Sequence, residues 1–263
     1  MKISMAKSMQ LTVTLVACAF LLVPTLQSVL AGVTVNYRLG LSSGLTLEWI
    51  GKVWNLYLDS IFLSIGIAVA CLACTLIIGV PAAYGLARRP GWISRILEEF
   101  ISLPLAVPGL ALALALLQLY GSMRGFRTSW TFILVGHVLY TLPFMVRSTL
   151  AVLAAMDLKT LEEGAASLGA SPWQRFRDVV IPNAMPGILA GSLTVVTLSI
   201  GEFNLTWMLH TPYLKTLPVG LADSYASMRL EVASAYTLVF FIIIVPLLMA
   251  MQWASQRAQR IGK

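Results

Sequence analysis

Long apolar runs, separated by short stretches that hold most of the charged residues, dominate this chain. Six runs are long enough to count as membrane spans, at about 11–32, 59–87, 97–120, 129–154, 185–208 and 234–254. A helix that crosses a bilayer needs about 20 apolar residues, and none of the runs alternates as a half-buried strand does. We therefore expect an all-α membrane protein with about six transmembrane helices.

The composition supports the same fold class. Of the 263 residues, 58% are hydrophobic and only 11% are charged, whereas soluble domains have about 25% charged residues. This excludes an ordinary soluble enzyme. The net charge of +7 would indicate nucleic acid in a soluble protein, but here the charges lie in blocks between the spans. We therefore expect no nucleic-acid partner.

The distribution of Lys and Arg predicts the orientation. With the N-terminus in the cytoplasm, most of these residues outside the spans lie on the cytoplasmic side, and the C-terminus lies there too. The loops at 33–58 and 209–233 would then face the periplasm. The first run follows Lys2 and Lys7 and ends near Ala31, as a cleaved signal peptide would, but its length favours a retained helix.

Other motifs within the apolar runs indicate helix geometry and packing and not a catalytic or metal-binding role. Pro104 and Pro108 predict kinks in the third span. Cys71 and Cys74 form a CxxC pattern inside an apolar run, without a second cluster, so we interpret them as packing residues. The sequence predicts no catalytic residues, no metal site and no cofactor.

The polar segment at 157–187 is more informative. In its first half a short helix is predicted, because apolar residues recur on one face: Leu158, Leu161, Ala165 and Leu168. Gly169 follows in a good position to end that helix with a left-handed residue. A compact element of this kind, between two spans, favours docking onto another protein, and the alternative is an amphipathic connector on the lipid surface.

A second short helix is predicted to begin directly after Gly169. Ser171 can cap its N-terminus, Pro172 suits its first position, and Gln174 completes a capping box. Pro182 is expected to end it, because proline has no N–H to continue the helix. Three apolar residues would share one of its faces: Trp173, Phe176 and Val180.

This segment resembles the EAA signature of permease subunits of bacterial binding-protein-dependent ABC importers. That signature reads Glu-Ala-Ala, three residues, Gly, nine residues, Ile, one residue, Leu-Pro. Its places are taken here by Glu163, Gly164, Ala165, Gly169, Val179, Ile181 and Pro182. The departures are Gly164 for alanine and two aliphatic exchanges. Stretches 79–88 and 103–109 also resemble the family, so that the likeness covers about 55–255.

The resemblance implies a permease domain at 59–255, preceded by an N-terminal span and outer loop at 1–58 and followed by a cytoplasmic tail at 256–263. It also implies that the segment is a coupling helix against a separate ATPase subunit. The chain has no G-x-x-x-x-G-K-[ST] phosphate loop, so we expect it not to be an enzyme. The expected ATPase contacts are Glu163, Gly164, Ala165, Gly169, Ala170, Ser171, Pro172, Trp173, Gln174, Arg175, Phe176, Arg177 and Pro182.

Further partners follow from the same resemblance. They are a second permease subunit, identical or homologous, and a solute-binding protein that is periplasmic or lipid-anchored. The protein would be a multi-pass protein of the bacterial inner membrane, importing a small polar solute that is polyamine or phosphonate-like. The alternative is a free-standing secondary carrier or channel that is not driven by ATP.

Polar residues inside the spans are candidates for the translocation path or gate. Glu202, Asn204 and Arg147 are the three that we assign there. Glu202 either contacts solute or a gate, with Arg147 as a conceivable partner, or serves structural hydrogen bonding. His137 is interpreted as a packed histidine. In the loop at 209–233, three residues could dock the binding protein or could simply be solvated: Tyr213, Lys215 and Asp223.

Overall fold

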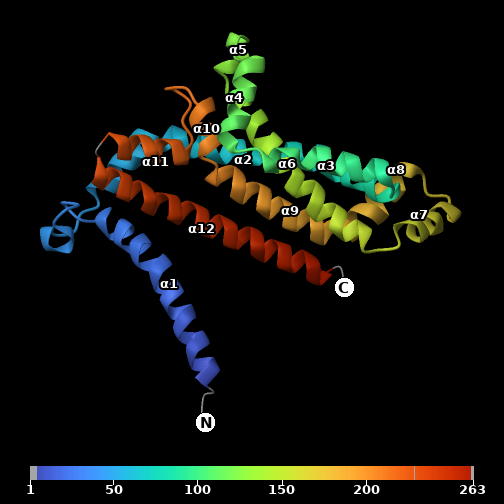
Figure 1. The fold of residues 1–263 in the computed structure, drawn as a ribbon, viewed down its shortest axis with the longest axis horizontal. Helices are drawn as coiled ribbons and strands as arrows, with labels where there is room; N and C mark the ends of the chain where they lie inside the picture. Colours follow the sequence, from blue (N-terminus) through green and yellow to red (C-terminus); the bar gives the residue numbers. More distant parts are fainter. Residues whose placement is uncertain (1–4, 228, 262–263) are drawn as a thin grey trace. The chain divides into compact units, whose positions relative to one another are not determined.

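The computed structural model describes residues 5–227 and 229–261, which form a helical protein (Figure 1). The long helices are α1 (Met5–Ala31), α2 (Glu48–Arg88), α3 (Trp92–Ala106), α4 (Gly109–Tyr120), α6 (Trp130–Ala154), α9 (Ile181–Gly201) and α12 (Leu230–Ile261). The shorter ones are α5 (Arg124–Arg127), α7 (Leu158–Ser167), α8 (Pro172–Gln174), α10 (Asn204–Leu209) and α11 (Leu217–Ala226). A 3₁₀ turn at Gly40–Ser43 and a π-helical turn at Arg175–Val180 complete the described elements.

Five of the described helices are long and apolar enough to cross a membrane, and α3 with α4 makes a sixth if the pair counts as one span. This agrees with the expected all-α fold of about six spans. The pair is bent by 102°, far more than a kink. Val107 is extended between the two helices, because a residue that precedes a proline, here Pro108, avoids the helical region.

Two expected outer loops are shorter than predicted. Helix α2 already begins at Glu48, within the expected loop 33–58, and α11 lies within the expected loop 209–233. The apolar pattern missed the first turns of α2 because polar residues interrupt them, with an exposed Glu48–Lys52 ion pair at 2.7 Å. The last two residues of the expected tail at 256–263 lie outside the described residues.

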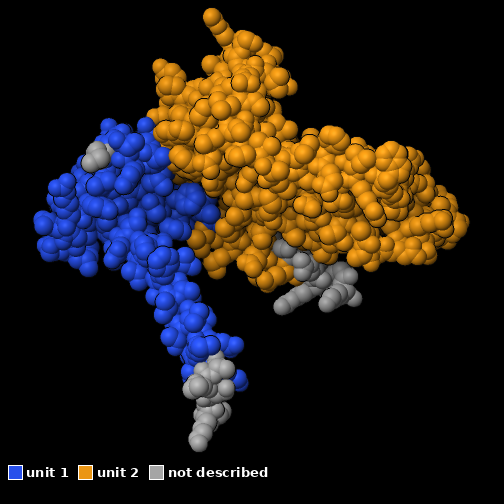
Figure 2. Space-filling model, viewed as in Figure 1, with its two compact units in different colours: residues 1–58, 220–244 blue, residues 59–219, 245–263 orange. Residues whose placement is uncertain are grey.

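The chain forms two compact units, 1–58 with 220–244 and 59–219 with 245–263 (Figure 2). In the first, the end of α1 packs closely on α12, since a Cβ on Gly32 would lie 2.5 Å from the backbone nitrogen of Ala235. The N–H of Tyr37 donates to Glu231 at 3.0 Å. The most apolar window of α1 is fully exposed, as expected of a helix whose solvent is lipid.

The second unit is built around the close packing of α6 and α9. Gly187 and Gly191, four residues apart on α9, face α6, and a Cβ on Gly187 would lie 2.5 Å from the carbonyl oxygen of Ser148. Small residues at this spacing let two membrane helices approach closely. Leu158 and Val180 belong to the same buried cluster as the two helices, so the 157–182 segment is fixed to the α6–α9 pair.

Candidate functional site

The first helix of the 157–182 segment starts at a side-chain cap. Asp157 accepts hydrogen bonds from the Thr160 hydroxyl at 2.6 Å and from the Thr160 N–H at 3.2 Å. These two donors hold the pKa of the Asp157 carboxyl below its ordinary value. The following residue, Leu158, is buried. Together the cap and the buried side chain fix the point at which α7 begins.

Gly169 ends α7 as predicted. Its φ is +87°, a left-handed conformation that side chains with a Cβ rarely adopt. The N–H of Ala170 donates to the carbonyl of Ala165 at 3.1 Å, and the N–H of Gly169 donates to that of Ala166 at 2.9 Å. These two bonds make a Schellman motif, which reverses the chain and satisfies the last carbonyls of the helix.

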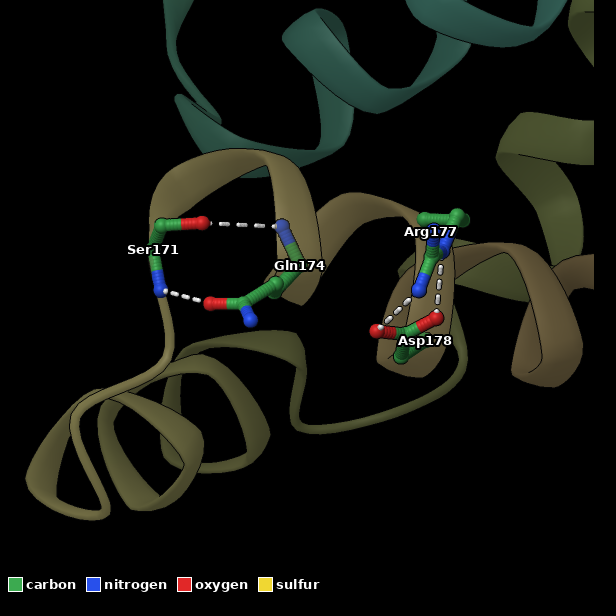
Figure 3. Close-up of polar contacts among 4 residues, drawn as sticks. All are labelled: Ser171, Gln174, Arg177 and Asp178. Atoms are coloured by element: carbon green, nitrogen blue, oxygen red, sulfur yellow. Dashed lines mark hydrogen bonds and ion pairs between the residues drawn. The ribbon is translucent and has the colours of Figure 1, made fainter.

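The predicted capping box is present at the start of α8 (Figure 3). The hydroxyl of Ser171 accepts from the N–H of Gln174 at 3.3 Å, and the N–H of Ser171 donates to the Gln174 side chain at 2.8 Å. Pro172 occupies the first turn of this helix. The turn between α7 and α8 is therefore held by local bonds on both sides.

The prediction that Pro182 ends the second helix is wrong. Residues 172–201 form one continuous helical stretch, in which α8 passes through the π-helical turn into α9. A proline needs room for its ring and leaves one carbonyl without its usual donor. The wider π turn, Arg175–Val180, lies directly before Pro182, as such bulges do where a helix must adapt. As a result the segment is joined rigidly to the α9 span.

Several apolar side chains of this segment point outward instead of into the core. Leu168 is 90% exposed and Trp173 is 64% exposed, with Leu161 also exposed. Arg177 is exposed and pairs with Asp178, Nε to Oδ1 at 2.7 Å (Figure 3). The remaining expected contact residues divide into two groups. Glu163, Gly164, Pro172, Gln174 and Pro182 are exposed, and Ala165, Ala170, Arg175 and Phe176 are half-buried.

Glu162, which the sequence analysis missed, holds α7 against the end of α2. It is buried and accepts a hydrogen bond from the Tyr84 hydroxyl, and its other oxygen lies 3.2 Å from Nε of Arg88. Phe176 packs on the ring of Tyr84 with centroids 5.2 Å apart. One signal in the sequence marks Glu162, which lies four residues after the buried Leu158 and thus on the same face of α7.

Glu202 lies where α9 stops and α10 begins. Its carboxylate accepts hydrogen bonds from the N–H of Leu205 at 3.1 Å, and from the N–H and hydroxyl of Thr206 at 3.0 and 3.2 Å. A Cβ on Gly109, the first residue of α4, would lie 3.5 Å from this carboxylate. The breaks in the α3–α4 and α9–α10 pairs therefore meet at Glu202. We call this point the break site. It is defined by Gly109, Glu202 and Thr206 and by the side chains that contact them.

His137 extends the break site to α6. Its Nε2 lies 2.8 Å from the Thr206 hydroxyl, and its Nδ1 lies 2.8 Å from the Ser199 hydroxyl. A carboxylate only accepts hydrogen bonds, so Thr206 donates to Glu202 and must itself accept from Nε2–H. Nδ1 then has no proton and accepts from Ser199. Both ring nitrogens are thus used within the bundle, in agreement with a packed histidine.

The family model for the binding-protein-dependent transport system inner membrane component matches residues 75–260. The chain belongs to this family. As a member, it is the permease subunit of an ABC importer and a multi-pass inner-membrane protein, and the ATPase is a separate subunit. The 157–182 segment lies within the matched range, between the spans α6 and α9.

The permease is similar to proteins that are named for different substrates. It is 30% identical over 224 residues to the putative 2-aminoethylphosphonate permease PhnV of Salmonella typhimurium, covering 82% of each chain. It is 28% identical over 222 residues to the molybdenum permease ModB of Haemophilus influenzae, covering 77% of this chain and 95% of ModB. A crystal structure of a bacterial importer of alginate has the same fold, with a TM-score of 0.73 at 13% identity, over 95% and 94% of the two chains.

In the permease, Arg147 does not pair with Glu202. Its Nε lies 3.8 Å from Glu98 of α3, and the interpretation as a partner of Glu202 is wrong. Arg147 lies ten residues beyond His137 on α6, or about 15 Å along a helix, while His137 lies at the break site. Asn204, the third candidate for the path, is exposed at the start of α10.

The remaining candidates differ in how far they are exposed. Tyr213 is 94% exposed between α10 and α11, whereas Lys215 and Asp223 are half-buried. Cys71 is buried and lies 3.1 Å from the Thr141 hydroxyl, and Cys74 is half-buried, both as free thiols. This position agrees with packing residues.

Proposed function

We propose that the 157–182 segment is the docking element for the ATPase subunit and that the permease forms part of the translocation path for a small phosphonate-like solute. One observation carries the first half of the proposal. The segment is fixed by a cap, a Schellman motif, a capping box and the Glu162 contacts, yet it exposes Leu161, Leu168 and Trp173. A rigid element with exposed apolar anchors suits a protein interface.

The connections of the segment support a mechanical role. At one end α7 is tied to α2 through Glu162, Tyr84 and Arg88. At the other end it continues through the π turn into α9, which ends at Gly201, directly before Glu202. A displacement of the segment by the ATPase would therefore move α2 and α9 together. The break site, where α9 stops, is our candidate gate.

The solute is proposed from two considerations. PhnV and ModB are named for transport of 2-aminoethylphosphonate and of molybdenum. Glu202 is already occupied by three hydrogen bonds within the bundle, so it is poorly suited to bind a cation. This favours a phosphonate-like anion over a polyamine. A solute-binding protein and a second permease subunit, identical or homologous, would complete the importer.

Co-purification tests the docking proposal. We expect a tagged permease in mild detergent to bring down an ATPase, and Gly169→Val to abolish this, because a β-branched residue at φ +87° breaks the turn. Gly164→Ala is the matched control, since a Cβ there meets nothing within 4 Å and restores the family's alanine. If Gly169→Val keeps the ATPase while remaining folded, the segment is not the docking element.

Uptake into cells tests the solute. We expect uptake of radiolabelled 2-aminoethylphosphonate that depends on both the permease and an intact ATPase, and that excess spermidine does not inhibit. Inhibition by spermidine with no phosphonate uptake would favour the polyamine alternative. Uptake that persists without any ATPase would favour the free-standing carrier.

A further inference from the structure

A charged cavity of the permease lies at the opposite end of the α6–α9 pair from the break site. The end of α2, the start of α3, the end of α6 and α7 enclose a cavity of about 1230 Å³. Its wall is strongly charged, and the basic residues among those that line it are Arg88, Arg95, Arg147, Lys159 and Arg175.

The acidic residues of this wall are all engaged within the protein. Among the described lining residues there are four, and each has a partner: Glu98 with Arg147, Asp157 with Thr160, Glu162 with Tyr84 and Arg88, and Glu163 with Lys159. Three of the five basic side chains are used in these pairs. The cavity therefore keeps an excess of positive charge that its own acids do not neutralise.

The five basic and four acidic lining residues leave a net charge of +1, and Arg95 and Arg175 are the two basic residues outside the pairs above. Neither guanidinium forms an ion pair with a described residue, and Nε of Arg175 is buried without a hydrogen-bond partner. A buried charged donor without an acceptor is costly. Arginine binds phosphate oxygens with two parallel N–H groups. An anionic oxygen ligand in this cavity would satisfy both side chains.

Helix α3 indicates what kind of anion fits. Its face toward the cavity has a helical spacing of three and four residues: Gly91, Ser94, Arg95 and Glu98. The rest of α3 exposes a continuous set of large apolar side chains: Trp92, Ile93, Ile96, Leu97, Phe100 and Leu103. An amphipathic helix with an exposed tryptophan at one end suits the membrane interface. The cavity wall therefore borders the exposed apolar face of α3, which is suited to contact acyl chains.

We propose that this cavity binds the phosphate head group of an anionic phospholipid, with Arg95 and Arg175 as its ligands and the acyl chains along the apolar face of α3. Basic pockets between membrane helices bind such head groups in this way. The site would brace α7 against α3, since Arg175 follows the turn after α7 and Arg95 lies on α3. A bound lipid would thereby stiffen the part of the permease to which the ATPase docks.

Native mass spectrometry of the full-length permease, with the subunits that purify with it, tests this proposal. We expect phosphatidylglycerol to be retained over phosphatidylcholine, and the double variant Arg95→Gln/Arg175→Gln to lower its retention about tenfold. The matched control is Arg89→Gln/Arg124→Gln, which removes two charges from exposed arginines that do not line the cavity and should keep the lipid.

Further variants and probes distinguish a lipid head group from a free anion and control for misfolding. Arg95→Lys/Arg175→Lys keeps both charges and should retain most of the lipid. If this variant is folded but loses as much lipid as Arg95→Gln/Arg175→Gln, the two arginines are not the ligands. An equal loss in the control pair would show nonspecific attraction. If inorganic phosphate binds with the same dependence on the two arginines while phosphatidylglycerol is not retained, the site takes a free anion and the lipid proposal is wrong.

Discussion

The 157–182 segment and the break site are both polar, but they are held in different ways. The segment is held mostly by bonds between residues three to five positions apart, at Asp157, Gly169 and Ser171. The break site combines local bonds, from Leu205 and Thr206 to Glu202, with hydrogen bonds between residues more than 60 positions apart, from His137 to Ser199 and Thr206. Local bonds can form in a solvent-exposed element, whereas the break site depends on the packed bundle around it.

This difference predicts unequal sensitivity to substitution. In the segment, removing one local bond leaves groups that water can reach. In the break site the freed groups stay buried, where an unsatisfied donor costs the full desolvation penalty. The following changes test the comparison, beginning with the largest expected effect.

Glu202→Ala should be the most damaging change. It leaves three buried donors without an acceptor, the N–H of Leu205 and the N–H and hydroxyl of Thr206, at a cost of at least about 3 kcal/mol. We expect the apparent Tm of the detergent-purified permease to fall by about 10 °C, measured by scanning fluorimetry. Asn204→Ala, two positions away and exposed, should leave it unchanged. Equal Tm values for both variants would mean that the network carries no stability.

Glu162→Gln should have the next largest effect, because it removes the charge from a buried polar contact that ties the segment to α2. We expect amide hydrogen exchange in α7 to become about tenfold faster, which corresponds to about 1.4 kcal/mol. Glu163→Gln removes only an exposed pair with Lys159 at 3.8 Å and should change exchange by about twofold or less. The same acceleration in both variants would contradict the assignment of Glu162 as the anchor.

Ser171→Ala removes one half of the capping box at the start of α8. The expected cost is about 1 kcal/mol, or about fivefold faster amide exchange around Gln174. Ser167→Ala is the control, because that hydroxyl bonds only to a carbonyl of its own helix. An unchanged exchange rate in Ser171→Ala would show that the Ser171 hydroxyl does not stabilise the turn.

The smallest effect concerns pH and Asp157. The folded pKa of Asp157 is below the unfolded value because Thr160 donates to the carboxylate. Its stabilisation of α7 is therefore present above the unfolded pKa and is lost as the pH falls through the folded pKa. Amide exchange in α7, corrected for intrinsic rates, should show this loss below about pH 4. Asp157→Asn keeps a capping side chain and should lack the pH dependence, so an identical pH profile would exclude Asp157 as its origin.

Much of the 157–182 segment could be read from the sequence because its signals are local. Ser171, Pro172 and Gln174 predicted the capping box, and Gly169 predicted the left-handed end of α7, each within a few residues. The prediction that Pro182 ends the helix was wrong because it, too, used only a local signal. A local rule predicts a helix end at proline, but the π turn that accommodates it joins the segment to a span whose position depends on α6.

The sequence by itself determined the apolar runs, the family signature and the caps, since each depends on composition or on spacing along one helix. Only the tertiary structure decided that Glu162, and not its neighbour, is buried against α2, and that Arg147 pairs with Glu98. It alone placed Gly109, His137 and Glu202 at a single point where two helix breaks meet. These contacts join residues far apart in the chain, and their energies arise from burial, which no local pattern specifies.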